Sequence, residues 1–267
     1  MNRSAVTNAC PRIIATAAEA LAWIRAQRHA GKSVGLVPTM GALHTGHLSL
    51  IERSQQECDC TVVSIFVNPM QFGPHEDFNK YPRPLTADLE KLAAAGVELV
   101  FVPTVDEMYP AGFNTHVDPG ALGQTWEGAF RPGHFRGVLT IVLKLFEMLP
   151  ADRAYFGQKD FQQTVVVRQM VADLNLPIEI VICPTIRDND GLALSSRNAF
   201  LDAPQRKSAL SISRGLRLAK EQFAAGQRDA AQLGELVRQT IATEPGLEIQ
   251  YVAVVDPISL AELSQVT

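Results

Sequence analysis

Residues 37–47 read VPTMGALHTGH, and this stretch decides the fold of the chain. A short apolar segment, Ser33–Val37, precedes the loop, and a helix-like segment, His47–Cys58, follows it. A strand, a loop with two glycines and a helix direct backbone N–H groups and the positive end of a helix dipole towards an anion. His44 and His47 lie where that helix begins, so we expect both to reach one bound phosphate. The stretch predicts a nucleotide site, with a tight turn carrying polar side chains as the alternative.

Strand-like and helix-like segments alternate on both sides of this loop, which predicts an α/β fold with a doubly wound parallel sheet. The βαβ unit around the loop implies parallel strands and a right-handed crossover. The expected strands are Ser33–Val37, Thr61–Val67, Val97–Val102, Arg153–Phe156 and Pro177–Ile182. The expected helices are Ala17–Ala30, His47–Cys58, Thr86–Ala95, Arg136–Leu149 and Asp160–Leu174.

The pattern changes after Pro184. Two long helical segments, Ala203–Ala225 and Asp229–Thr243, are followed by one strand-like segment, Glu248–Val255. This order predicts a second, smaller α+β domain, joined to the first through Pro184–Asn198.

Composition narrows the classes of function. The chain has 267 residues, 46% hydrophobic and 19% charged, with a formal net charge of -4. Affinity for nucleic acid needs concentrated Lys and Arg, so we expect no nucleic-acid partner. No apolar run is long enough to cross a bilayer, and residues 1–12 lack the basic and apolar regions of a signal peptide. The four cysteines show neither disulfide nor zinc-site spacing, which favours the cytoplasm. Because no segment is long enough to cross a bilayer, we expect no membrane partner.

Two further loops carry groups suited to phosphate. Gly157–Asp160 follows a strand and opens a helix, where Lys159 can place a charge on phosphate and Asp160 can cap the helix. A surface lysine at a helix start is the alternative. Ser195, Ser196 and Arg197 follow a charged stretch, and a mobile loop could bring them onto a triphosphate. A helix-capping turn is the alternative there.

Uncharged amides follow another strand. Asn68 and Gln71 lie where ligands bind in open parallel sheets, and amides there can bind hydroxyl or carboxylate groups. An ordinary Asn-Pro turn is the alternative. Of Gln162 and Gln163, one is expected to face the site and the other to point away. The loop RPGHFRG, residues 131–137, either binds an anion or only turns the chain.

Five blocks in order span most of the chain. They read PTMGALHTGH (38–47), FVNPMQF (66–72), RPGHF (131–135), FGQKDFQQ (156–163) and LALSSRN (192–198). Together they resemble the pantothenate synthetase (pantoate–β-alanine ligase) family, of the His-x-Gly-His nucleotidyltransferase superfamily. One block alone is only moderately specific, whereas five ordered blocks are very specific.

The resemblance implies a Rossmann-like domain over residues 1–185 that binds ATP and pantoate, and a smaller lid over residues 186–267. Similar chains continue beyond a segment like Tyr251–Val255, so we expect the lid to be truncated at its end. The resemblance also implies a homodimer that condenses (R)-pantoate with β-alanine. ATP is the co-substrate and Mg²⁺ the cofactor, with AMP, pyrophosphate and a pantoyl adenylate intermediate. The alternatives are a nucleotidyltransferase of a related coenzyme pathway and a nucleotide-sensing protein without turnover.

The resemblance also implies roles for individual residues. The ATP contacts are Met40, Gly41, Ala42, Leu43, His44, Thr45, Gly46, His47, Gly157, Gln158, Lys159, Asp160, Ile186, Leu194, Ser195, Ser196 and Arg197. Gln71 matches a contact to pantoate and β-alanine, and Gln163 matches a contact to pantoate. Pro38 and Asn68 are our further candidates for substrate binding. His47 matches the family's proton donor, and Asp88 is a candidate contact to magnesium. We predict that His44, His47, Lys159, Ser196 and Arg197 stabilise charge on the α-phosphate and the leaving group.

Overall fold

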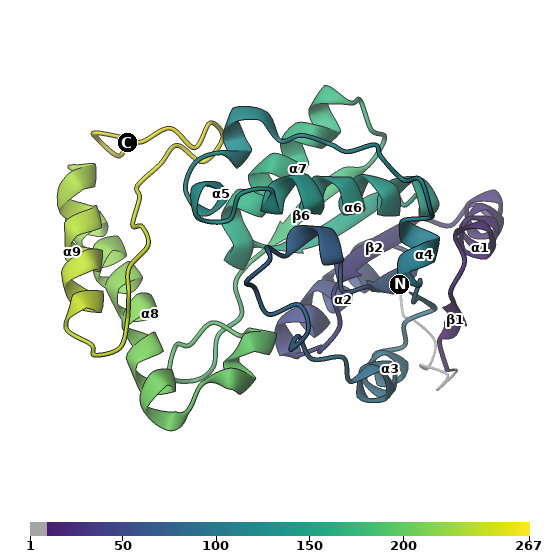
Figure 1. Ribbon diagram of the computed structural model, residues 1–267, viewed down its shortest axis with the longest axis horizontal. Helices are drawn as coiled ribbons and strands as arrows, with labels where there is room; N and C mark the ends of the chain where they lie inside the picture. The colour runs from purple at the N-terminus through teal and green to yellow at the C-terminus, as the bar shows by residue number, and fades with distance from the viewer. Residues whose placement is uncertain (1–9) are drawn as a thin grey trace.

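A six-stranded, wholly parallel sheet forms the centre of the molecule (Figure 1). The computed structural model describes residues 10–267, so the expectation of no signal peptide lies almost wholly outside the described residues. The strand order is β1-β4-β3-β2-β5-β6. The strands are β1 (Arg12–Ile14), β2 (Val34–Thr39), β3 (Cys60–Ile65), β4 (Leu99–Phe101), β5 (Arg153–Gly157) and β6 (Glu179–Cys183). The five strands expected for the sheet are confirmed with shifted ends, and β1 was not predicted.

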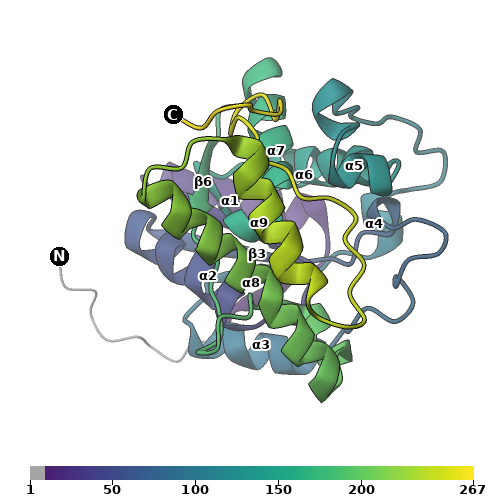
Figure 2. The same cartoon turned by 90° about the vertical axis from the view of Figure 1, so that its left-hand side faces the viewer.

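Helices cover both faces of this sheet, as Figures 1 and 2 show. One buried cluster joins alternate strand residues such as Leu36 to α1 (Ala17–His29), α6 (His134–Met148) and α7 (Phe161–Asp173). The other joins the intervening residues, such as Val37, to α2 (Thr45–Glu57) and α3 (Leu85–Ala94). Burial on both faces explains why the strands read as continuous apolar runs rather than alternating ones.

The topology places the ends of β2 and β5 side by side. From β2 the chain adds β3 and β4 on one side, then returns to add β5 and β6 on the other. Ligands of doubly wound sheets bind outside the carboxyl ends of the strands where the order reverses. The loops after β2 and β5, with His44 and Lys159, meet at this point.

Several short helices were not predicted from the sequence, because a helix of one or two turns is too short to show a hydrophobic periodicity. They are α4 (Val105–Met108), α5 (Glu127–Phe130), η1 (Pro69–Gln71), η2 (Gly120–Gly123), η3 (Gln158–Asp160) and η4 (Ser196–Phe200).

The two long helices after β6 are confirmed as α8 (Ala203–Ala224) and α9 (Ala230–Ala242). They lie against each other beside the sheet and its helices (Figure 1). Gly215 permits this approach, because a Cβ there would lie 3.2 Å from Cγ1 of Val237. Both helices begin at an aspartate that accepts a backbone N–H through its side chain.

The strand expected over Glu248–Val255 is wrong. Within residues 10–267 this segment forms only an isolated antiparallel bridge, between Val255 and Glu262. The Val252 carbonyl accepts from Nη2 of Arg238 at 2.7 Å, and the Val254 carbonyl accepts from the N–H of Leu263 at 3.0 Å. The β-branched pattern of this segment reflects partial burial, and its backbone groups bond to a side chain and a turn instead of a sheet.

The segment after residue 250 returns to α5. Nε1 of Trp126 donates to the Leu260 carbonyl at 3.0 Å, and the rings of Phe130 and Tyr251 stack with centroids 5.8 Å apart. The C-terminal part is therefore fixed to the α/β part beside a helix that carries Glu127.

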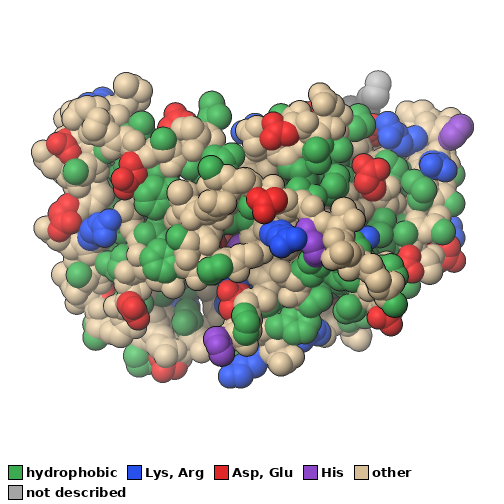
Figure 3. Space-filling view, turned by 45° about the horizontal axis from the view of Figure 1, so that its top comes forward, with side chains coloured by type: hydrophobic (Ala, Val, Ile, Leu, Met, Phe, Trp, Pro, Cys, Tyr) green, Lys and Arg blue, Asp and Glu red, His purple; other side chains and the backbone are tan. Residues whose placement is uncertain are grey.

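No helix among residues 10–267 is both long and apolar enough to span a membrane. On the face drawn in Figure 3, basic, acidic and hydrophobic side chains are interspersed.

Candidate active site

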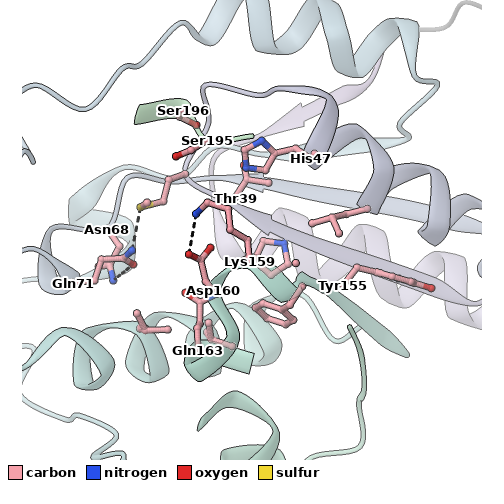
Figure 4. Close-up of a pocket in the computed structure, with 18 of the residues that line it drawn as sticks. Thr39, His47, Asn68, Gln71, Tyr155, Lys159, Asp160, Gln163, Ser195 and Ser196 are labelled. Atoms are coloured by element: carbon pink, nitrogen blue, oxygen red, sulfur yellow. Dashed lines mark hydrogen bonds and ion pairs between the residues drawn. The ribbon is translucent and has the colours of Figure 1, made fainter. Parts of the chain in front are cut away.

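A cavity of about 260 Å³ opens at the carboxyl ends of β2 and β5, and Figure 4 shows its polar lining. It is bordered by most of the residues that the sequence predicted. These are Pro38, Met40, His44, Gly46, His47, Asn68, Gln71, Gly157, Lys159, Asp160, Gln163, Ile186, Leu194, Ser195, Ser196 and Arg197.

Six predicted residues do not line this cavity. Leu43 is buried in the cluster with α2 and α3, and Thr45 borders a neighbouring recess beside Arg187 and Arg206. The others are Gly41, Ala42, Gln158 and Asp88.

His44 and His47 cap the helix on which they lie. His44 is the N-cap of α2, and its Nδ1 accepts the N–H of Gly46 at 3.1 Å. Nδ1 of His47 accepts the N–H of His44 at 3.3 Å. An N–H group can only donate, so both Nδ1 atoms are unprotonated and a neutral ring carries its hydrogen on Nε2. Gly46 leaves room for this arrangement, because a Cβ there would lie 2.9 Å from the His44 ring.

This capping changes how the helix end meets an anion. Backbone N–H groups were expected to face the phosphate, but those of His44 and Gly46 donate to imidazoles instead. The helix end therefore meets the cavity through the two imidazoles, whose Nδ1 atoms bind backbone and whose Nε2–H groups remain as donors. The ring centroids lie 4.1 Å apart, so the two imidazoles lie next to each other in the lining of the cavity.

Both imidazoles are held neutral. Burial, followed by the charges of Lys159 and Lys91, lowers the pKa of His44. Burial, followed by His44 and the two lysines, lowers the pKa of His47 to about 3. Two neutral donors next to a cationic side chain suit the binding of a phosphate oxygen better than the release of a proton.

Asp88 holds the loop that precedes α2. Its side chain is 1% exposed, and its two carboxylate oxygens accept the N–H groups of Ala42 and Leu43 at 2.7 and 2.8 Å. Lys91 lies 3.9 Å from this carboxylate and donates to the Leu43 carbonyl at 2.6 Å. Ala42 has φ 50°, a strained conformation outside glycine, which these bonds maintain. The carboxylate is thus engaged with backbone, and we do not place magnesium on it.

Lys159 extends into the middle of the cavity (Figure 4). Its ammonium lies 3.0 Å from the Asp160 carboxylate. The expectation that Asp160 caps the next helix is wrong, because the side chain of Asp160 makes no capping bond to α7 and pairs with Lys159. A single turn, η3, between β5 and α7 turns both side chains into the site.

Ser196 and Arg197 lie over the loop after β2. Oγ of Ser196 donates to the Ala42 carbonyl at 3.0 Å. The Arg197 guanidinium donates to both carboxylate oxygens of Asp77, at 2.8 and 3.0 Å, and this pairing holds the pKa of Asp77 below its usual value. The segment from β6 to η4 is therefore docked on the α/β part by two separate contacts.

Amide side chains line the wall of the cavity that lies across from the two histidines. Gln71 and Asn68 lie together there, with Gln163 below them in the view of Figure 4. Gln162 is buried, and its Nε2 donates to the carbonyls of Leu122 and Thr125. The expectation that one of the paired glutamines faces the site and the other points away is confirmed.

Arg131 belongs to a network that the sequence left open between anion binding and a turn. Its guanidinium pairs with Glu76 and Glu127 at 2.6 and 2.8 Å. His134, whose pKa burial lowers, contacts Arg131 and the Gln71 carbonyl through its two ring nitrogens at 3.1 and 2.8 Å. The sequence analysis did not identify Glu127 as a site residue, because α5 is only four residues long. Its i,i+4 spacing to Arg131, which suits an ion pair on a helix, is the pattern that could have identified it.

No group of three or more His, Cys, Asp or Glu side chains within the described ranges is arranged to hold a metal ion. The donor set therefore does not form a protein-made magnesium cage. It fits magnesium only as an ion carried largely by the oxygens of a bound triphosphate, which is how this cation is usually held.

Comparisons with known proteins show the family of the chain. The family model described as Pantoate-beta-alanine ligase matches residues 12–267. The pantothenate synthetase of Chloroflexus aggregans is 55% identical over 255 residues, which cover 96% of this chain and 91% of that protein. The pantothenate synthetase of Moorella thermoacetica is 51% identical over 254 residues, covering 95% and 90%.

Solved structures show the same fold. The pantothenate synthetase of Thermus thermophilus matches with a TM-score of 0.90 and 46% identity, covering 96% of this chain and 91% of that one. The pantoate–β-alanine ligase of Francisella tularensis, in a complex described as containing beta-gamma ATP and β-alanine, matches with a TM-score of 0.78 and 36% identity, covering 92% and 90%. With a family match across the described sheet, cavity and C-terminal part, the chain belongs to the pantoate–β-alanine ligase family.

Proposed function

We infer that this chain is a ligase that condenses (R)-pantoate with β-alanine, coupled to cleavage of ATP, giving pantothenate, AMP and pyrophosphate. The observation that carries this inference is the composition of one cavity. Neutral imidazole donors and Lys159 lie on one side, and the amides of Gln71 and Gln163 lie on the other. The first set suits a polyphosphate, and the second suits an acid that must not be neutralised by a cation.

The first step makes a leaving group. A carboxylate resists attack by an amine, so an oxygen of the pantoate carboxylate first attacks the α-phosphorus of ATP. The bond from that phosphorus to the bridging oxygen breaks, and pyrophosphate leaves. Negative charge grows on the α-phosphate oxygens and on pyrophosphate. In this proposal, Nε2–H of His44 and His47 and the ammonium of Lys159 stabilise that charge, which is supported by the presence of all three residues in the cavity lining.

The second step forms the amide. The neutral amine of β-alanine attacks the carbonyl carbon of pantoyl adenylate, the carbon–oxygen bond to phosphate breaks, AMP leaves, and the amine proton passes to solvent. Water competes with this amine, so the intermediate needs shelter. Ser196 and Arg197, docked over the loop after β2, supply part of the cover.

The histidines act in this scheme by hydrogen bonding. A proton donor must carry a proton that it can release, whereas His47 has a pKa lowered to about 3 and is neutral at physiological pH. We therefore assign His47, which the family resemblance marks as a proton donor, to charge stabilisation through Nε2–H.

We also propose residues 1–185 as the unit that binds ATP and pantoate and residues 186–267 as its lid. Magnesium enters with the triphosphate in this proposal, and no step depends on an ion held by protein side chains alone. A homodimer in the cytoplasm remains a prediction, which light scattering of the purified protein tests for the dimer.

One assay tests the function. Pyrophosphate release from ATP with pantoate alone, followed by AMP and amide formation after β-alanine is added, is the expected result. A related nucleotidyltransferase would retain the nucleotide in its final product, and a nucleotide sensor would bind ATP without releasing pyrophosphate. Either outcome would overturn the proposal.

A further inference from the structure

A chain of hydrogen bonds leads from Tyr109, at the end of α4, to the amide wall of the cavity. The Tyr109 hydroxyl lies 2.7 Å from Oδ1 of Asn68, and Nδ2 of Asn68 lies 3.1 Å from Oε1 of Gln71. Nε2 of Gln71 lies 3.2 Å from the sulfur of Met40, on the cavity side (Figure 4). None of the proposed chemical steps uses Tyr109.

Two backbone groups fix the orientation of the Asn68 amide. The N–H of Met70 lies 3.2 Å from one end of this amide, and an N–H can only donate, so that end is the oxygen. The Gly137 carbonyl lies 3.1 Å from the other end and can only accept, so that end is the NH₂ group. Asn68 is 1% exposed, so bulk solvent has little access to its amide.

The orientation of Asn68 then determines that of Gln71. The second hydrogen of Nδ2 needs an acceptor, so the Gln71 atom facing it is Oε1, and the Gln71 NH₂ group faces the cavity. The Met40 thioether is a weak acceptor that a substrate oxygen can replace. Oδ1 of Asn68 cannot donate, so the phenol hydroxyl of Tyr109 donates to it. Burial raises the pKa of Tyr109, which keeps that hydrogen in place.

The fold supports this chain on both sides. A Cβ at Gly137 would lie 2.2 Å from the Met70 carbonyl oxygen, so only glycine lets α6 approach η1 closely enough for the bond to Asn68. The ring of Tyr109 is held by the edge of Phe113, at a centroid distance of 5.0 Å, and by Phe66 at 6.2 Å.

We propose that Tyr109 and Asn68 are positioning residues that hold the Gln71 amide with its NH₂ group towards the acid substrate, so that the site selects a ligand presenting oxygen acceptors there. Asn68 acts through Gln71 in this proposal, because both ends of its own amide are engaged with protein groups. The proposal rests on the proposed function, since it names how the pantoate side of that cavity is oriented.

A double-mutant cycle with full-length enzyme tests it. Tyr109→Phe keeps the ring and removes the donor; Gln71→Ala removes the group acted upon. We expect Tyr109→Phe to raise the Kd and KM for pantoate about threefold to tenfold, the usual effect of one neutral hydrogen bond. The KM for ATP and kcat should change less than about twofold in this variant, because the phosphate side is untouched. In the Gln71→Ala background the same substitution should have almost no further effect on pantoate affinity.

Two further variants sharpen the result. Asn68→Asp keeps the acceptor for Met70 and Tyr109 but offers no donor to Gln71, so pantoate affinity should fall at least as much as in Tyr109→Phe. Thr240→Val removes a hydroxyl on α9 that donates to the Leu236 carbonyl, and serves as the matched control.

The outcomes are distinct. An unchanged pantoate Kd in Tyr109→Phe, an equal factor in the Gln71→Ala background, or an equal loss for ATP would each overturn the proposal. Calorimetric titration of pantoate gives Kd without turnover. If the native enzyme binds pantoate but releases no pyrophosphate, the proposed function is wrong. The positioning role is still tested, because it is measured from the Kd for pantoate alone.

Discussion

The backbone N–H of His44 donates to Nδ1 of His47, so the second histidine of the motif caps the first. Because His44 in turn caps Gly46, each side chain has a structural task at Nδ1 and keeps Nε2–H for the cavity. Structure and chemistry therefore use opposite edges of the same ring, and substitutions can separate them.

His44→Asn separates capping from chemistry. Asparagine is a good N-cap and retains an acceptor for the Gly46 N–H, but it has no group at the position of Nε2. We expect this variant to keep its thermal midpoint while pyrophosphate release in a single turnover slows about 10²–10³-fold. His44→Ala should lose the same rate and in addition about 1 kcal/mol of stability. A native rate in His44→Asn would remove His44 from the chemistry.

Lys159→Ala should slow adenylate formation far more than it weakens pantoate binding. The ammonium lies in the cavity beside Asp160, where a growing negative charge gains most from it. We expect a loss of about 10²–10³ in single-turnover rate with a pantoate Kd within about threefold of native. Lys32→Ala, at an exposed lysine that binds Gln27, is the matched control. Equal rates for the two variants would contradict the assignment.

The low pKa of His47 makes stability depend on pH. The folded protein keeps this imidazole neutral down to about pH 3, whereas the unfolded chain protonates it near its ordinary pKa of 6.5. Between these values the unfolded state binds more protons, so stability falls as pH is lowered and is unaffected by this group above about pH 7. The expected slope is about 1 kcal/mol per pH unit between about pH 6 and pH 4.

His47→Gln removes that titration, so its urea midpoint should fall less steeply with acid than that of the native protein. His29→Gln, at an exposed histidine on α1, should follow the native curve. Parallel curves for all three proteins would show that His47 is not held neutral by the fold.

Asp88→Asn should destabilise the loop after β2 and leave the dependence of activity on magnesium unchanged. One side-chain oxygen remains for the two N–H groups of Ala42 and Leu43, so one of them is left facing an NH₂ group. We expect a loss of about 1–3 kcal/mol in stability, a slower adenylation step and an unchanged magnesium concentration for half-maximal activity. Glu90→Gln, exposed on the same helix, is the control. A shift in the magnesium requirement would place Asp88 near the ion instead.

Sequence alone predicted the α/β class, five of the six strands and the three loops that border the cavity. These predictions succeed because each rests on a local pattern: short apolar runs, glycines, and charged or polar residues at strand ends. The missed strand β1 has three residues. It pairs with β4, where Arg12 lies beside Leu99, and it buries Ile14 in the core, and no local pattern contains these distant contacts.

The roles of single residues needed the structure. The sequence marked Asp88 as a candidate contact to magnesium, and only its burial against Ala42 and Leu43 shows that it binds backbone N–H groups instead. Tyr109 lies 41 residues from Asn68 in a segment without any motif. The prediction for segment 248–255 was wrong for the opposite reason. The segment has the composition of a strand, but a strand also needs a neighbouring strand to pair with, which composition does not reveal.

The bond from Trp126 to Leu260 has a practical consequence. The chain contains two tryptophans, and the other, Trp23, packs against the core at α1. Indole emission depends on its polar neighbours, so the emission of Trp126 would change if the C-terminal segment left this contact. In a Trp23→Phe background, a nucleotide-dependent change in emission would follow that release in real time without any added label.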